Sequence, residues 1–170
     1  VTPAGTWTYE YDALGNRTSL KDANNQTTIF NYDIANRLDI IDYPSGMADV
    51  DFGYDPLGRL TGMDDSLGHT TWVYDNLSRV TSITDPFNKT VGYGYDLLGR
   101  QTTLIYPDGK TLTQNYDALD RLTNQVFQFG AQAYTTSYAY DAAGRLIQCT
   151  YPNGIVQNNT FDTADRFAGL

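Results

Sequence analysis

Residues 95–104 read YDLLGRQTTL, and the first six letters of this stretch recur along the whole chain. Tyr-Asp pairs begin at residues 11, 32, 54, 74, 95, 116 and 140, and Phe161-Asp162 provides an eighth, degenerate copy. Successive copies are 20 to 24 residues apart. A near-constant period of this length is the sequence signature of a repeat protein. We therefore expect residues 1–170 to form one array of about eight repeats, each of about 21 residues.

The repeated motif is an aromatic residue, Asp, a variable residue, Leu or Ala, a small or polar residue, and Arg. All eight arginines of the chain belong to it. In the first copy Asn16 takes the arginine position and Arg17 follows it, which indicates a different local turn there. We predict a structural role for these motif residues: Tyr11, Asp12, Tyr32, Asp33, Arg37, Tyr54, Asp55, Gly58, Arg59, Tyr74, Asp75, Arg79, Tyr95, Asp96, Gly99, Arg100, Tyr116, Asp117, Arg121, Tyr140, Asp141, Gly144 and Arg145.

Each motif is predicted to be a tight turn between two strands. The fourth position after the aromatic is Gly, Asn, Ser or Asp, types that enter left-handed backbone or hydrogen-bond their own turn. The Asp carboxylate can accept hydrogen bonds from backbone N–H groups. The Arg guanidinium can donate two hydrogen bonds at once to carboxylate or carbonyl oxygens, so the two side chains together should stabilise the turn. The position before the fourth is apolar in every copy, and we expect it to be buried: Leu14, Ala35, Leu57, Leu77, Leu98, Leu119, Ala143 and Ala164.

The segments on both sides of each motif have the composition of β-strands. Two residues before the motif aromatic, six of eight copies carry a second aromatic, and nine residues after it most copies carry an apolar residue. Side chains two apart in a strand share a face, so an aromatic row should follow one face of the sheet. Pro- and Gly-containing stretches such as YPSG, YPDG and YPNG mark a second turn in many units.

Each unit thus reads as strand, turn, strand, turn, and eight units predict about sixteen short strands. The fold class is all-β, an antiparallel β-hairpin array. A sheet this wide must coil or curl because neighbouring strands twist relative to one another, so we expect a curved or spiralling β-strip. The extra length between Tyr116 and Tyr140, around Gly130, Ala131 and Gln132, is expected to loop out of the strip.

Charge and composition narrow the possible partners. The net charge of −9 and the lack of any Lys/Arg cluster argue against nucleic acid. Nothing approaches the roughly 18 consecutive apolar residues of a membrane span. The chain lacks an initiator Met and a signal-peptide pattern, so we expect a fragment of a much larger protein.

The eight motifs resemble the YD repeat, also called the Rhs repeat, over essentially the whole chain. Proteins of that family occur in bacterial polymorphic toxins, in the C component of insecticidal toxin complexes and in animal teneurins. The resemblance implies a β-strip that forms part of a hollow β-shell, in a secreted or cell-surface bacterial protein. The partners it implies are further repeats of the parent chain and an enclosed C-terminal polypeptide. It implies structural roles for the Tyr, Asp, Gly and Arg positions and no active site.

Residues with catalytic or metal-binding chemistry are few. His69 is the only histidine and lies in a predicted turn, so we read it as a solvated turn residue. Cys149, the only cysteine, occupies a position that is mostly Leu, Ile or Met in the other copies and is read as a core residue. The aspartates outside the motif scatter through turns without the loop spacing of a calcium site. The sequence therefore predicts no enzyme, no cofactor and no metal site.

Two functions remain open. The main one is a non-catalytic shell wall around a polypeptide cargo. The alternative is a carbohydrate- or cell-surface-binding module, because exposed aromatic rings stack on sugars; its platform would be Tyr9, Trp72 and Tyr93. The same rings could instead line a core. Sheet edges near residues 6–11 and 163–170, or the aromatic face, are expected to allow self-association.

Overall fold

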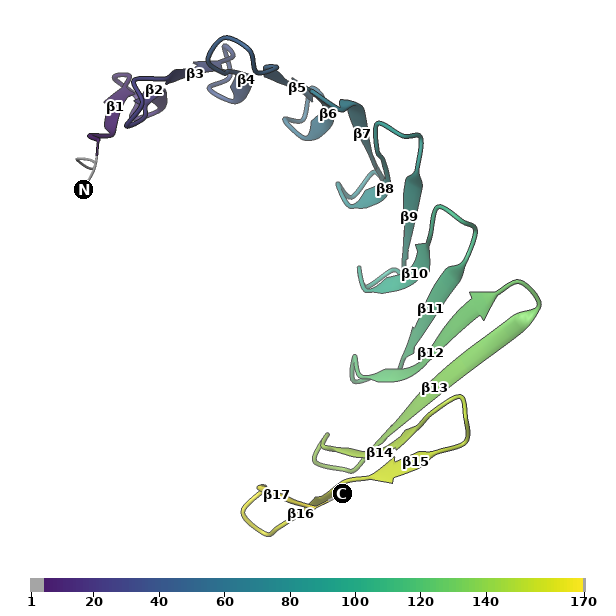
Figure 1. Ribbon diagram of the computed structural model, residues 1–170. Coiled ribbons are helices and arrows are strands. Elements are labelled where there is room, and N and C mark those ends of the chain that lie inside the picture. Colours follow the sequence, from purple (N-terminus) through teal and green to yellow (C-terminus); the bar gives the residue numbers. More distant parts are fainter. Residues whose placement is uncertain (1–4, 170) are drawn as a thin grey trace. The chain divides into compact units, whose positions relative to one another are not determined.

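A computed structural model describes residues 5–169, and in them it contains strands and turns but no helix (Figure 1). Contacts divide the chain into two units, one ending at Lys89 and one beginning at Thr90. The predicted all-β class is confirmed. The first unit holds β1 (Thr8–Tyr11), β2 (Arg17–Lys21), β3 (Thr27–Tyr32), β4 (Leu38–Asp42), β5 (Val50–Tyr54), β6 (Leu60–Asp65), β7 (Gly68–Tyr74) and β8 (Val80–Thr84).

The second unit continues the same alternation of strands and turns. Its strands are β9 (Thr90–Tyr95), β10 (Gln101–Ile105), β11 (Thr111–Tyr116), β12 (Leu122–Phe129), β13 (Gln132–Tyr140), β14 (Leu146–Thr150), β15 (Val156–Asn158), β16 (Thr160–Phe161) and β17 (Phe167–Gly169).

Strand pairing follows the sequence order in both units. From β1 to β8, and again from β9 to β15, each strand pairs antiparallel with the next one along the chain. β16 and β17 form a separate hairpin. In neither unit does the first strand pair with the last, so the strand ladder is open. In such a meander all motif turns lie along one edge and the connecting turns along the other.

The register explains why two sequence positions vary together. The residue two before the motif aromatic lies directly opposite the residue nine after it, and both project from the same face. In the sixth copy both members are glutamine, Gln114 opposite Gln125. In the other copies with a full register an aromatic meets an apolar residue: Tyr9–Leu20, Phe30–Ile41, Phe52–Met63, Trp72–Ile83, Tyr93–Leu104 and Tyr138–Cys149.

A β-bulge recurs next to each motif turn. In the first hairpin Glu10 pairs with Ser19 but Tyr11 pairs with Arg17, so Thr18 is left over on the second strand. The same shift precedes the motif aromatic in the other hairpins, including the last, between Thr160 and Phe161. A bulge bends its strand and increases the local twist. Each repeat therefore carries a bend at the same place, beside its motif turn.

The sheet has almost no buried core. Among the described residues only Phe30 and Cys149 are buried hydrophobic residues, and no large side chain is fully buried. The expectation that the apolar turn position is buried was wrong. Leu14 is 76% exposed and Leu98 is 72% exposed, and the other members of the set are exposed as well. The turn tip extends beyond the last strand pair, where a single-layer sheet offers nothing to cover it.

Two further expectations were wrong. The extra residues around Gly130 do not loop out; they lengthen β12 and β13, which meet in a tight turn, Phe129 opposite Gln132 (Figure 1). The described residues hold seventeen strands, close to the expected number of about sixteen; the extra one arises because the chain leaves the ladder at Asn159, whose backbone N–H donates to the Ile147 carbonyl. The first motif turn has the same backbone hydrogen bonds as its siblings, Gly15 to Asp12 and Asp12 to Asn16. Leu170, an expected strand residue, lies outside the described residues.

Candidate functional site

The motif turn is held by its aspartate. In the sixth copy the Oδ1 of Asp117 accepts the backbone N–H of Leu119 at 2.8 Å and that of Arg121 at 3.0 Å. The backbone N–H of Asp117 donates to the Arg121 carbonyl at 2.9 Å, which closes the loop. Asp120 has a φ of 62°, in the left-handed region. One carboxylate oxygen therefore satisfies two turn N–H groups that no strand could reach.

The motif arginine binds its own turn and also the next repeat. The Nε of Arg121 donates to Oδ2 of Asp117 at 2.7 Å, whereas its Nη1 donates to the backbone carbonyl of Asp141 at 3.3 Å. The guanidinium carbon lies 4.8 Å from the ring centroid of Tyr140. The Tyr140 hydroxyl in turn donates to the Leu122 carbonyl at 2.9 Å. We call this set of bonds from one Arg to the next Tyr and Asp the inter-repeat contact.

The inter-repeat contact recurs along each unit. A guanidinium over an aromatic ring gains a cation–π attraction, and its planar fork can donate to two acceptors at once. A single arginine therefore closes one turn and fixes the position of the following one. The equivalent triples are Arg37 with Tyr54 and Asp55, Arg59 with Tyr74 and Asp75, and Arg100 with Tyr116 and Asp117.

The remaining predicted motif residues take corresponding places. Arg79 binds the carboxylate of its own turn, Asp75, at 2.7 Å. Tyr95 ends β9 and Asp96 begins the turn that Arg100 closes. Arg145 lies over Phe161 at 4.9 Å, so the degenerate eighth copy keeps the ring contact. The glycines at the fourth position, Gly58, Gly99 and Gly144, all have positive φ.

Sequence reasoning missed a second role for the fourth position. Where it is not glycine, its φ is still near 60°, a conformation that costs energy for residues with a Cβ. Its side-chain oxygen accepts a hydrogen bond from the preceding repeat, which offsets that cost. The donor and acceptor pairs are Asn16 to Asn36, Arg59 to Ser78, Arg100 to Asp120 and Arg145 to Asp165.

The first copy replaces the guanidinium with an amide. The Nδ2 of Asn16 donates to Oδ2 of Asp12 at 2.9 Å, in the place of an arginine Nε. Arg17, one residue later, lies over the Phe30 ring at 4.2 Å. The Arg17 cation therefore still covers an aromatic ring of the next repeat. That ring is Phe30, which lies opposite Ile41 in the strand register, and not the motif tyrosine.

The turn carboxylates are stabilised in their charged form. The pKa of Asp33 is lowered chiefly by the hydrogen bond from the Arg37 side chain and then by the Arg37 backbone N–H. The pKa of Asp117 is lowered first by the backbone N–H of Arg121 and then by its side chain. Hydrogen bonds to the ionised form favour it over the protonated form. The motif turns are thus built around ionised aspartates.

The three residues of the expected glycan platform lie in three separate strands. Tyr9 is 49% exposed on β1, whereas Trp72 on β7 and Tyr93 on β9 are half-buried. Each ring lies opposite its own apolar partner across a hairpin. Tyr9 and Trp72 are separated by the five intervening strands of the first unit, and Tyr93 belongs to the second. Tyr9 and Trp72 are therefore not neighbours within the first unit.

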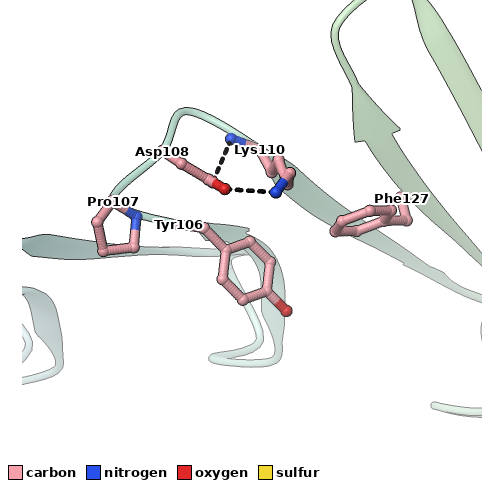
Figure 2. A pocket seen from close by; sticks show the side chains of 5 residues that line it. All are labelled: Tyr106, Pro107, Asp108, Lys110 and Phe127. Carbon is pink, nitrogen blue, oxygen red and sulfur yellow. Dashed lines mark hydrogen bonds and ion pairs between the residues drawn. The ribbon is translucent and has the colours of Figure 1, made fainter.

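A concave aromatic site lies elsewhere, in the second unit. A pocket of about 450 Å³ is lined by Tyr106, Pro107, Asp108, Lys110 and Phe127. Figure 2 shows these side chains. The Tyr106 and Phe127 rings meet edge to face, with centroids 6.0 Å apart. Lys110 is paired with Asp108 at the rim. The YPDG stretch was expected only as a turn. The pocket also depends on Phe127 of the neighbouring strand β12, which no local sequence pattern indicates.

Residues with reactive side chains occupy ordinary positions. His69 lies in β7 rather than in a turn, and its Nδ1 is 2.9 Å from Oδ1 of Asp64, with both side chains exposed. Cys149 is buried opposite Tyr138. Between residues 5 and 169 no group of three or more His, Cys, Asp or Glu side chains could hold a metal ion. The same residues include no helix long and apolar enough to cross a membrane.

Comparison with known families agrees with the repeat pattern. Residues 1–27, 11–50, 54–90, 74–111 and 116–156 match the model of the RHS repeat family. The chain belongs to the RHS repeat family. No curated protein sequence matches it.

Several solved structures share the fold of this RHS repeat chain. The crystal structure of TcdB2-TccC3-Cdc42 matches with 19% identity and a TM-score of 0.75, covering 95% of this chain and 10% of that one. TcdB2-TccC3 without its hypervariable C-terminal region matches with 20% identity and a TM-score of 0.74 over the same shares of 95% and 10%. The Tc holotoxin pore of Photorhabdus luminescens gives 19% identity, a TM-score of 0.74 and shares of 95% and 10%. The RHS chain thus spans about a tenth of these structures' length.

The inter-repeat contact predicts unequal effects for two arginines. Arg100→Ala removes bonds to its own turn and to the next repeat, whereas Arg166, 79% exposed, bonds only to Asp162 among the described residues. We expect Arg100→Ala to lower the melting temperature by roughly 3 to 6 °C and Arg166→Ala to leave it nearly unchanged. Thermal unfolding followed by circular dichroism measures both. Equal melting temperatures for the two variants would contradict the contact.

The lowered pKa values predict loss of stability in acid. Because the motif aspartates have a lower pKa folded than unfolded, their contribution is complete above the unfolded value of about 4 and disappears as the pH falls through the folded values. The urea midpoint should be flat from pH 7 to about 5 and fall steeply below about 4. The Asp117→Asn variant should have a lower urea midpoint at pH 7, and its midpoint should fall less in acid. A urea midpoint that is the same at pH 2.5 and pH 6 would contradict a stabilising role for the ionised motif aspartates.

Proposed function

We propose that this chain is a structural, non-catalytic part of the wall of a shell that encloses a polypeptide, in a secreted protein of the bacterial toxin type. Membership of the RHS repeat family and the fold shared with the Tc toxin structures support the proposal. The observation that carries it is the inter-repeat contact, because it positions each repeat on the next without any core. Such an array can extend by adding repeats while remaining one layer thick.

A sheet one layer thick is suited to forming the wall of a shell. Its strands satisfy their hydrogen bonds along the ladder, and each motif turn is closed by its own Asp. Among the described residues no group of three or more His, Cys, Asp or Glu side chains could hold a metal ion. The wall's partners would be further repeats of the parent protein and the polypeptide that they surround. The proposed location, outside the producing cell, follows from the toxin complexes that share the fold.

Protease protection tests the wall in the longer protein that contains this chain. We expect a C-terminal polypeptide enclosed by the shell to resist limited proteolysis under native conditions. The double variant Arg100→Ala, Arg121→Ala removes two inter-repeat contacts and should expose the polypeptide. Lys89→Ala, at an exposed turn on the opposite edge, is the matched control and should preserve protection. If the C-terminal polypeptide were cleaved equally fast in the unaltered protein and the double variant, the wall proposal would be rejected.

Carbohydrate binding is the second candidate, and the pocket beside Tyr106 favours it. Two aromatic rings at its wall and a carboxylate and an ammonium at its rim could stack on a sugar and hydrogen-bond its hydroxyl groups. A thermal-shift screen against a glycan panel, with and without Ca²⁺, tests this. A ligand at about 100 times its dissociation constant adds about 2.7 kcal/mol.

Matched variants separate a ligand site from packing. If Tyr106 lies in a sugar site, Tyr106→Ala should abolish the shift caused by one sugar class and leave the protein folded. Trp72→Ala tests the platform expected from the sequence and should lower stability without affecting the shift, because Trp72 is half-buried and lies opposite Ile83 in the strand register. No shift across the panel would remove this second function.

A further inference from the structure

The connecting turn between β14 and β15 holds an asparagine with a reactive neighbour. Residues 151–154 read YPNG, and Asn153 is the only one of the chain's twelve asparagines that is followed by glycine. Asn153 is exposed. Glycine has no Cβ, so the side-chain carbonyl carbon of the preceding residue can approach the glycine nitrogen closely. An asparagine in this position can react with its own backbone.

The reaction forms a ring within residues 153 and 154. The backbone nitrogen of Gly154 gives up its proton and attacks Cγ of Asn153, so a C–N bond forms. The Cγ–Nδ2 bond breaks, and the amide nitrogen takes up a proton and leaves as ammonia. Water then opens this succinimide ring at one of its two carbonyl carbons, which gives either aspartate or isoaspartate. Nothing is oxidised or reduced, and water is the only co-reactant.

A second turn of the same unit already holds the aspartate form of this sequence. Residues 106–109 read YPDG, with Asp108 in the place of Asn153. In both turns the side-chain Oδ1 accepts the backbone N–H two residues later, at 3.2 Å for Asp108 and at 3.1 Å for Asn153. The backbone bond that closes each turn is also the same, from the Tyr106 N–H to the Lys110 carbonyl and from the Tyr151 N–H to the Ile155 carbonyl, both at 2.8 Å. Aspartate at residue 153 therefore fits the turn.

The isoaspartate form does not fit the turn. In isoaspartate the backbone passes through Cγ, so one more atom lies between the Cα atoms of residues 153 and 154. The bond from Tyr151 to Ile155 that closes the turn spans this link. β15 begins at Val156, directly after the turn, and pairs with β14 over only three residues. Isoaspartate should therefore loosen the pairing of β15.

The hydrogen bonds of the turn slow the reaction in the folded chain. The Gly154 N–H donates to the Tyr151 carbonyl at 2.9 Å, so its nitrogen cannot attack Asn153 until the turn opens. Segments with few buried apolar contacts and exposed backbone hydrogen bonds open at a low cost in free energy. Residues 151–156 are all exposed. Asn153 should thus react in the folded chain, at a lower rate than in an unfolded chain.

Asp108 is protected from the same ring closure. Closure at an aspartate needs the uncharged carboxyl group, because an ionised carboxylate is a poor target for the backbone nitrogen. Lys110 pairs with Asp108, and the pKa of Asp108 is lowered chiefly by the hydrogen bond from the Lys110 side chain and then by the Lys110 backbone N–H. The amide of Asn153 carries no charge that could protect it, and isoleucine stands in the place of Lys110.

We propose that Asn153 is a site of spontaneous deamidation. In neutral or alkaline solution Asn153 converts to aspartate and isoaspartate before the other turn asparagines do. The conversion adds one negative charge to a turn whose Tyr151 and Pro152 line a pocket together with Tyr134. The proposal is independent of the shell and carbohydrate functions, because it needs only this turn.

Peptide mapping by mass spectrometry tests the proposal on the 170-residue chain after incubation at mildly alkaline pH. The peptide that contains Asn153 should gain the mass difference between an amide and a carboxyl group. Asn24 is the matched internal control, because it is exposed at the same place of a turn with the same backbone bonds but is followed by Asn25. Asn24 should keep its amide while Asn153 is half converted. An Asn153 that keeps its amide, or an Asn24 that converts as fast, would overturn the proposal.

A variant of the following residue separates the ring closure from simple exposure. Gly154→Asn should slow the conversion roughly tenfold, because a Cβ crowds the attacking nitrogen. The turn should survive this change, since asparagine takes the same left-handed position at Asn25 and Asn88. The unaltered chain should convert faster in urea, and hydrogen exchange at residues 156–158 should be faster in the isoaspartate product only. An unchanged rate in Gly154→Asn would contradict closure through the Gly154 nitrogen, and equal rates with and without urea would contradict the need for the turn to open.

Discussion

The shared arginine is the interaction on which the rest of this structure depends. A guanidinium such as that of Arg121 binds its own turn's carboxylate, Asp117, and at the same time lies over Tyr140 and donates to the next turn. Hydrogen bonds in the ladder fix neighbouring strands side by side but do not fix the bent turns at their ends. Because the sheet is one layer with scarcely any buried side chains, no core can do so either.

Because of this arrangement, some positions of the motif vary less between copies than others. The motif Asp and Arg each form hydrogen bonds with several partners and hardly vary. The fourth position is either glycine or a polar residue. Glycine enters the left-handed conformation at no cost, and Asp120 enters it with an added bond to Arg100. The pair Gln114 and Gln125 shows a third kind of constraint, since two positions eleven residues apart change together because the register places them opposite one another.

Much of the fold could be predicted from the sequence because its information is local. The period, the turn chemistry and the shared face of Tyr9 and Leu20 all follow from spacing within one repeat. Burial at Leu98 could not be predicted, because it depends on whether a second layer exists. The site was foreseen only in part for the same reason. The bond between Arg and Asp within a turn is local, but the reach of Arg121 to Tyr140 and the pocket made by Tyr106 and Phe127 depend on the distance between neighbouring hairpins.

A double-mutant cycle tests most directly whether each arginine stabilises the following repeat. Arg121→Lys keeps the charge but loses the planar fork, and it is combined with Tyr140→Leu in the next repeat or with Tyr116→Leu in its own. Urea unfolding should give a coupling free energy of about 0.5 kcal/mol or more between Arg121 and Tyr140, and additivity between Arg121 and Tyr116. Coupling to Tyr116 with none to Tyr140 would show that the arginine acts only within its own turn and would contradict the account.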